Sequence, residues 1–130
     1  MSGSVTVQRV QHVSIARPRG DEAAAAARRF YGEALGLHEV GVPRGLAHMD
    51  LIWYRVGDDE LHVFTSDDPP GDHGQHFCIQ VEDVQALRAQ LAGAGVEIID
   101  DTAIPNRPRF FIRDPFGNRI ECTTILGPYE

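Results

Sequence analysis

The sequence predicts an α+β fold of two tandem βαβββ modules, whose eight strands form a curved mixed sheet with the helices on its outer face. Three observations carry this prediction: an internal repeat, a strand–helix–strand order that occurs twice, and strands in which apolar and polar residues alternate. The sequence QHVSI at residues 11–15 returns as QHFCI at 75–79, 64 residues later. ELHV at 60–63 matches RIEC at 119–122, 59 residues later.

The first module is expected over about residues 8–66. Alternating apolar residues predict its first strand at about residues 8–16. Asp21 is a candidate cap for the following helix, which Gly36 ends. Turn residues then separate three further strands, expected near residues 37–42, 48–56 and 60–66.

The second module repeats this order over about residues 75–125, after a loop rich in proline and glycine. Its first strand is expected at about residues 75–81, and Asp83 caps a helix that ends near Gly95. The sequence DPFGN at 114–118 is typical of a tight turn between two strands. The remaining strands are expected near residues 96–100, 108–113 and 118–125.

Composition narrows the possible functions. A length of 130 residues predicts a single domain, residues 1–130. The net charge of −7 argues against nucleic acid or an anionic membrane as a partner, since both require a basic face. All 12 basic residues are arginine, which excludes lysine-based covalent catalysis. Two cysteines are too few for a disulfide scaffold, and no apolar run has membrane length, so we expect a cytoplasmic protein.

Four residues at equivalent places in the repeat are candidate metal ligands: His12 and His62 in the first module, His76 and Glu121 in the second. Strand side chains alternate between the two faces of a sheet. The aliphatic neighbours of these four residues must face the helices, because each helix needs an apolar surface to pack against. All four candidates therefore project from the opposite, polar face.

The chemistry of these side chains suits a divalent ion. Two imidazoles and one carboxylate leave coordination positions open on iron, and manganese, cobalt, nickel or zinc could bind the same set. An open position allows a substrate with two neighbouring oxygen atoms to chelate the ion. The ion then acts as a Lewis acid.

The histidine-bearing strands and the sequence DPFGNRIE at 114–121 resemble those of the vicinal oxygen chelate superfamily. That superfamily includes glyoxalase I, extradiol dioxygenases, fosfomycin-resistance enzymes and bleomycin-resistance proteins. The resemblance covers about residues 10–125. It implies that the metal ligands come from the first and fourth strands of each module, that is, His12, His62, His76 and Glu121.

The resemblance leaves the role of His62 open. Glyoxalase I-like members usually carry a glutamate at this position, whereas dioxygenases and fosfomycin-type members need only the ligands that match His12, His76 and Glu121. His62 is therefore a fourth ligand, a proton shuttle beside the metal, or a residue that only caps the pocket. Glu121 and His62 are the candidate catalytic residues.

The function implied is that of a metal-dependent enzyme acting on a small substrate that chelates the ion through oxygen atoms. A glyoxalase-like isomerase or lyase and an extradiol-type dioxygenase both remain open. The alternative is a binding protein of the bleomycin-resistance type, which sequesters a small molecule without catalysis.

The resemblance also implies a homodimer with shared sites, in which the two histidines of the first module meet His76 and Glu121 of the other subunit. Phe64 and Phe111 are expected on the same polar face, with Trp53 as a third candidate, and a second chain would cover them there.

Several other polar residues allow two interpretations. Arg119 has the phase of Glu121, so it either forms an ion pair or binds an anionic substrate. A cluster of three further arginines could attract a carboxylate or phosphate: Arg107, Arg109 and Arg113. Cys78 is expected to line the site without being reactive. Three histidines are expected to be solvated at strand edges or in loops: His38, His48 and His73.

Overall fold

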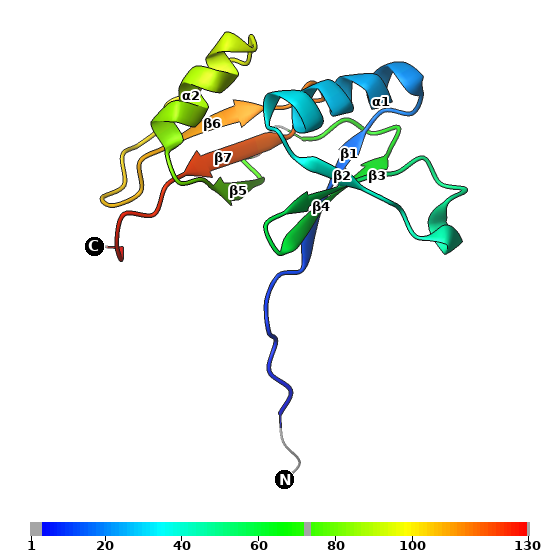
Figure 1. The fold of residues 1–130 in the computed structure, drawn as a ribbon, viewed down its shortest axis with the longest axis horizontal. Helices are drawn as coiled ribbons and strands as arrows, with labels where there is room; N and C mark the ends of the chain where they lie inside the picture. The colour runs from blue at the N-terminus through cyan, green and yellow to red at the C-terminus, as the bar shows by residue number, and fades with distance from the viewer. Residues whose placement is uncertain (1–3, 72–73, 130) are drawn as a thin grey trace.

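The computed structural model describes residues 4–71 and 74–129, and it contains two modules of the same topology (Figure 1). Module one consists of β1 (His12–Arg17), α1 (Asp21–Ala27), η1 (Arg28–Ala34), β2 (His38–Val40), η2 (Arg44–Leu46), β3 (Ile52–Val56) and β4 (Asp59–Thr65). Module two consists of β5 (His76–Gln80), α2 (Val84–Gly93), β6 (Arg109–Arg113) and β7 (Arg119–Thr123).

The strands are arranged in the same way in the two sheets. Strands are ordered β1-β4-β3-β2 in module one and β5-β7-β6 in module two. The first and last strands of each module pair in parallel, and the other neighbours pair antiparallel. Helices α1 and α2 lie on one side of the two sheets (Figure 1). The predicted pair of βαβββ modules, with mixed strand directions and helices on the outer face, is confirmed.

The register of the strands reproduces the sequence repeat. In each parallel pair, the histidine that begins the first strand faces a charged residue of the last strand, and the position two residues further faces the second candidate ligand. The corresponding partners are His12 with Glu60 and Ser14 with His62 in module one, and His76 with Arg119 and Cys78 with Glu121 in module two.

The expected eighth strand is reduced to an isolated bridge. Ile99 pairs antiparallel with Phe111 through two hydrogen bonds, each 2.8 Å long. The chain leaves α2 through Gly95, whose φ of 82° favours glycine, and reaches Asp100 and Asp101 directly after the bridge. The segment at this edge of the second sheet therefore pairs through one residue, whereas β2, at the equivalent edge of the first sheet, pairs through three.

The first strand begins later than expected. β1 starts at His12, and residues 4–11 form an extended arm that leaves the sheet (Figure 1). Val5 and Val7 on this arm are 94% and 88% exposed. Alternation alone predicted that the strand begins at about residue 8, but a strand also needs a neighbour that accepts its backbone hydrogen bonds.

The two helices begin in different ways. Asp83 caps α2 as predicted, because its carboxylate accepts hydrogen bonds from the backbone N–H groups of Gln85 and Ala86. The cap predicted for Asp21 is wrong, since Gly20 occupies the N-cap position of α1 with a φ of 105°. Asp21 lies instead in the first turn, where its charge complements the helix dipole.

The core lies between the helices and the sheets and confirms the predicted phases. Leu61, Val63 and Ile120 are buried at 1% exposure or less, and Val13 and Phe77 pack against the same cluster. The residues that alternate with them, among them the four candidate ligands, lie on the opposite face of each sheet.

The turn at residues 114–118 joins the two modules. Asp114, which is buried, accepts a 2.6 Å hydrogen bond from the Tyr31 hydroxyl of η1. Its carboxylate also accepts from the backbone N–H groups of Phe116 and Asn118. The Asn118 amide donates to the carbonyl of Ala16 in β1 at 2.8 Å. The turn therefore fixes module two against both a helix and a strand of module one.

Among the described helices, none has the length and apolar character needed to cross a membrane.

Candidate metal centre

His76 and Glu121 meet on the face of module two that lies away from α2. The parallel pairing of β5 and β7 places them on neighbouring strands, and 3.1 Å separates His76 Nε2 from Glu121 Oε1. His76 Nδ1 lies 2.8 Å from the carbonyl oxygen of Gly74. A carbonyl oxygen accepts hydrogen bonds only, so Nδ1 carries the proton and the lone pair of a neutral imidazole lies on Nε2.

Nε2 and the Glu121 carboxylate are then both electron-pair donors. Their close approach requires a cation between them, either the second imidazole proton or a metal ion. Zinc and similar ions bind histidine nitrogen and carboxylate oxygen. These two atoms, 3.1 Å apart, are therefore the donor types that such an ion would take. The hydrogen bond to Gly74 orients the ring as outer partners of metal-bound histidines do.

Arg109 holds the other oxygen of the same carboxylate. Its Nη1 lies 3.5 Å from Glu121 Oε2, and its Nε and Nη2 donate to the carbonyl of Thr102 at 3.2 and 2.7 Å. The Arg109 side chain is only 12% exposed, so its charge is weakly screened. Arg109 therefore orients Glu121 with Oε1 toward His76.

Three aromatic rings stack on the corresponding face of module one. The rings of Trp53 and His62 are parallel within 2°, with centroids 3.7 Å apart. His12 stacks on the other side of His62 at 4.0 Å. His12 Nδ1 lies 2.6 Å from Gln11 Oε1, an acceptor, so His12 Nε2 keeps its lone pair for a ligand bond.

His62 is held more tightly than His12. It is 8% exposed, and its Nε2 lies 2.8 Å from Glu60 Oε1. The hydrogen bond from His62 lowers the pKa of the Glu60 carboxyl, which is the charged partner of this contact. For His62 to bind a metal through Nε2, Glu60 would have to move away.

The structure therefore brings the predicted residues together as two pairs, His12 with His62 and His76 with Glu121. Each pair belongs to a different sheet. Over residues 4–71 and 74–129, no group of three or more histidine, cysteine, aspartate or glutamate side chains is placed to hold one ion.

The three aromatic residues expected on the polar face differ in exposure. Phe64 is 38% exposed, whereas Trp53 is partly buried by its stack on His62. Phe111 is 2% exposed, because the guanidinium of Arg119 lies 4.0 Å from its ring centroid and His76 packs edge-on at 5.0 Å. The expectation that Phe111 needs a second chain to cover it is wrong.

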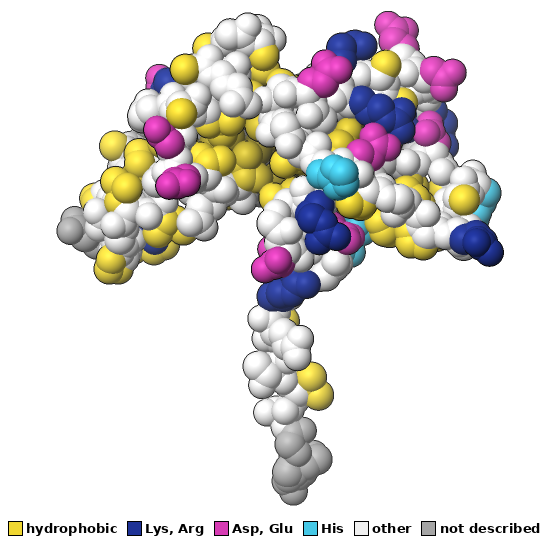
Figure 2. Space-filling model, in the orientation of Figure 1, with side chains coloured by type: hydrophobic (Ala, Val, Ile, Leu, Met, Phe, Trp, Pro, Cys, Tyr) yellow, Lys and Arg dark blue, Asp and Glu magenta, His cyan; other side chains and the backbone are white. Residues whose placement is uncertain are grey.

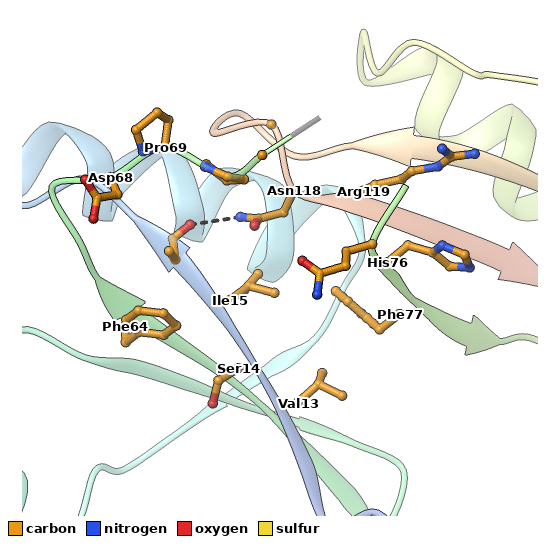
Figure 3. Close-up of a pocket in the computed structure, with 15 residues that line it drawn as sticks. Val13, Ser14, Ile15, Phe64, Asp68, Pro69, His76, Phe77, Asn118 and Arg119 are labelled. Atoms are coloured by element: carbon orange, nitrogen blue, oxygen red, sulfur yellow. Dashed lines mark hydrogen bonds between the residues drawn. The ribbon is translucent and has the colours of Figure 1, made fainter. Parts of the chain in front are cut away.

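A cleft of about 410 Å³ separates the edge strands β1 and β5 (Figure 3). Ser14 and Phe64 line it from module one, and His76, Asn118 and Arg119 line it from module two. Hydrophobic side chains also gather at the surface in the hollow between the two halves (Figure 2). The His76 ring and the Arg119 side chain extend away from β1, on the far side of this cleft (Figure 3).

The arginines expected as one cluster lie apart. Arg107 stacks on Tyr129 at 4.1 Å and bonds the carbonyl of Gly127. Arg113 donates to the carbonyl of Gly117. Arg119 forms its ion pair with Asp101 at 3.2 Å, and it is Arg109 that pairs with Glu121.

The remaining predictions concern Cys78 and three histidines. Burial, with a smaller effect of the Glu121 charge, raises the pKa of the Cys78 thiol to about 11, which agrees with an unreactive residue. His38 and His48 are exposed, as predicted. His73 lies outside the described residues.

Two neighbours of the site were not predicted from the sequence: Glu60, which contacts His62, and Arg109, which pairs with Glu121. Glu60 has the phase of His62 two residues away, so alternation could have placed it on the polar face. The position of Arg109 depends on the Thr102 carbonyl in an irregular segment, for which the sequence carries no periodic pattern.

Comparisons with known proteins agree with this fold. The sequence model of the Glyoxalase/Bleomycin resistance protein/Dioxygenase superfamily matches residues 9–122. A glyoxalase family protein from Bacillus anthracis is 33% identical, with a TM-score of 0.86 over 94% of this chain and 98% of that chain. No curated protein matches the sequence.

Two more distant structures share the fold alone. Lactoylglutathione lyase from Agrobacterium tumefaciens is 22% identical, with a TM-score of 0.67 over 91% of this chain and 94% of that chain. An antibiotic binding protein from Streptomyces is 24% identical, with a TM-score of 0.72 over 94% of this chain and 99% of that chain.

Proposed function

Because the chain belongs to the Glyoxalase/Bleomycin resistance protein/Dioxygenase superfamily, we propose that it is a divalent-metal-dependent enzyme. Its substrate is a small molecule that chelates the metal through neighbouring oxygen atoms. The ligands are His12, His76 and Glu121, with His62 as the candidate for a fourth position.

One observation carries this proposal: His76 Nε2 and Glu121 Oε1, two electron-pair donors, lie 3.1 Å apart. His76 donates its Nδ1 proton to the carbonyl of Gly74, so Nε2 is the nitrogen that faces Glu121. The contacts of the pair with Gly74 and Arg109 support this proposal, because they resemble the outer hydrogen bonds that orient metal ligands.

A divalent ion bound here supplies Lewis acidity, which stabilises negative charge on a substrate oxygen. The protein residues provide the ligand atoms and orient them. His76 and Glu121 provide fixed donor atoms, Arg109 keeps one carboxylate oxygen directed away from the site, and Gln11 orients the His12 ring. Three protein ligands leave coordination positions for two substrate oxygens.

We infer that two chains complete each site. The pair on module one offers His12 Nε2, and the pair on module two offers His76 and Glu121, but each pair lies in its own sheet. A two-fold axis would bring module one of one subunit against module two of the other and produce two equivalent sites. The same contact would cover Phe64, which is 38% exposed.

Metal analysis tests the proposal. Protein purified without chelators and reconstituted with iron, manganese, cobalt, nickel or zinc should bind about one ion per chain, measured by elemental mass spectrometry. Glu121→Gln and His76→Ala should each lose most of the metal and keep the folded structure by circular dichroism. His38→Ala is the matched control, because it removes an exposed histidine of β2.

Wild-type protein that binds no divalent ion, or Glu121→Gln protein with full occupancy, would contradict metal-dependent catalysis. The first result would instead support the sequestration of a small molecule without a metal.

His62 requires a separate comparison. Because Glu60 occupies its Nε2, we expect His62→Ala to lose far less metal than His12→Ala. Losses of equal size would identify His62 as a true fourth ligand.

A further inference from the structure

We propose that Arg119 binds a carboxylate of the substrate, so that the substrate carries this acid group in addition to its two chelating oxygens. The inference rests on the proposed metal-dependent function and concerns the substrate class. In this structure the guanidinium already holds a carboxylate, that of Asp101, at 3.2 Å.

The strand register places Arg119 beside both donors of module two. Arg119 is the partner of His76 in the parallel ladder and precedes Glu121 by two residues on β7. Residues two apart in a strand share a face and lie roughly 7 Å apart. A substrate that reaches the metal with one end therefore meets Arg119 with the next part of its structure.

The guanidinium is held in place. It lies 4.0 Å from the ring centroid of Phe111, which is 2% exposed on the face of β6 that lies away from the core. His76 contacts the same ring edge-on at 5.0 Å. Phe111 thus fixes Arg119 relative to His76, and a group fixed before binding loses less entropy on binding.

Arg119 is accessible where Arg109 is not. The Arg119 side chain is 25% exposed, and it extends away from β1 on the side of β5 where the His76 ring lies (Figure 3). Arg109 is 12% exposed, and Thr102 and Glu121 use its three nitrogen atoms. A guanidinium has five N–H donors, and Asp101 contacts Nη2 of Arg119. Other N–H donors of Arg119 therefore remain for a substrate carboxylate, which is planar and offers two oxygen atoms.

Asp101 is a weak competitor. Its side chain is 39% exposed in the irregular segment before β6, and exposed ion pairs contribute little. A substrate carboxylate can share the guanidinium with Asp101 or replace it.

The internal repeat gives this position opposite charges in the two modules. Glu60 occupies in module one the place that Arg119 occupies in module two. The chain has a net charge of −7, so an acidic substrate is repelled by the protein as a whole. A fixed arginine at the site offsets that repulsion where the substrate binds.

Two matched probes test the proposal by calorimetry on the metal-loaded protein. Catechol and 3,4-dihydroxybenzoate both chelate through vicinal oxygens and differ by one carboxylate. We expect wild type to bind 3,4-dihydroxybenzoate about tenfold more tightly than catechol. Arg119→Gln should abolish this preference without changing metal content or the affinity for catechol. Asp101→Asn should increase the preference, since it removes the competing carboxylate.

Arg88→Gln is the matched control, because Arg88 also forms an ion pair with an aspartate, Asp100, but lies on α2. It should keep the wild-type preference. Equal affinities of wild type for the two probes, or a preference that persists in Arg119→Gln, would overturn the role of Arg119. If neither probe binds in a metal-dependent way, the proposed metal-dependent function itself fails, and this result is distinct from the other two.

Discussion

Arg109 and Glu121 form an ion pair on the face of module two that carries the candidate metal ligands, with 3.5 Å between Arg109 Nη1 and Glu121 Oε2. The two side chains are 12% and 15% exposed. Arg109 is anchored on its other side by two hydrogen bonds to the Thr102 carbonyl. Glu121 is therefore oriented before any ion binds.

The first prediction follows from this contact. Replacing Arg109 with Gln removes the charge that orients Glu121, so metal affinity should fall by about 10–100-fold, the usual effect of losing an outer partner of a ligand. The metal affinity of Arg109→Lys should lie between those of wild type and Arg109→Gln, because lysine keeps the charge but cannot make both hydrogen bonds to the Thr102 carbonyl. Competition with a fluorescent chelator measures the affinities. Unchanged affinity in Arg109→Gln, with Arg88→Gln as control, would show that Arg109 does not position the ligand.

The second prediction concerns the contact between the modules. Tyr31→Phe removes the hydrogen bond to Asp114, which keeps its other donors from the turn, so the free energy of unfolding should fall by about 1.5–3 kcal/mol. Urea unfolding measures this loss. Arg28→Gln is a surface control, because its ion pair with Glu39 is half exposed and should contribute at most about 1 kcal/mol.

The same variant has a defined pH dependence. Burial and the Asp114 carboxylate raise the pKa of Tyr31 well above its usual value of 10. The folded state therefore keeps a proton that the unfolded state loses above pH 10, and this contribution to stability falls as the pH rises. Wild type should lose stability more steeply than Tyr31→Phe above pH 10. Parallel stability curves for the two proteins would contradict the buried hydrogen bond.

The third prediction concerns Cys78, which is exposed at the residue level but has a poorly solvated thiol. Burial, and secondly the charge of Glu121, raise its pKa to about 11. Because the thiolate is the reactive form, iodoacetamide should react at pH 8 on the order of 100-fold more slowly than with an unperturbed cysteine. Cys122 is buried with a pKa of about 12, and Cys78→Ser gives the background. A rate equal to that of free cysteine would contradict this environment.

Sequence alone could predict the face on which each candidate ligand lies. Because successive side chains of a strand point to opposite faces, His12 lies on the face opposite Val13, and His76 on the face opposite Phe77. This alternation does not depend on the rest of the chain. The repeat also predicted the equivalence of His62 and Glu121, which the two registers confirm. These properties are local or repeated, so one sequence is enough to find them.

Contacts across the sheet could not be predicted in the same way. The face of β3 on which Trp53 lies depends on where the turn after η2 ends. Its stack on His62 follows from the register of β3 and β4, which pairs the two residues. The residue Asp114 was assigned to a turn, but its bond to Tyr31 joins positions 83 residues apart. Pairings at such separation depend on the packing of whole modules, which leaves no periodic trace in the sequence.

The central claim is that a metal site takes His12 from one subunit and His76 and Glu121 from the other, and subunit mixing tests it most directly. His12→Ala and Glu121→Gln chains each carry one damaged half and one intact half. When the two chains are mixed and allowed to exchange, one of the two sites in every mixed dimer combines an intact His12 with an intact Glu121. Metal binding should return to about a quarter of the wild-type level in an equal mixture, since about half of the dimers are mixed and each has one intact site of two. Metal content that stays at the level of the separate variants, although mass spectrometry shows that the subunits exchange, would contradict the shared site.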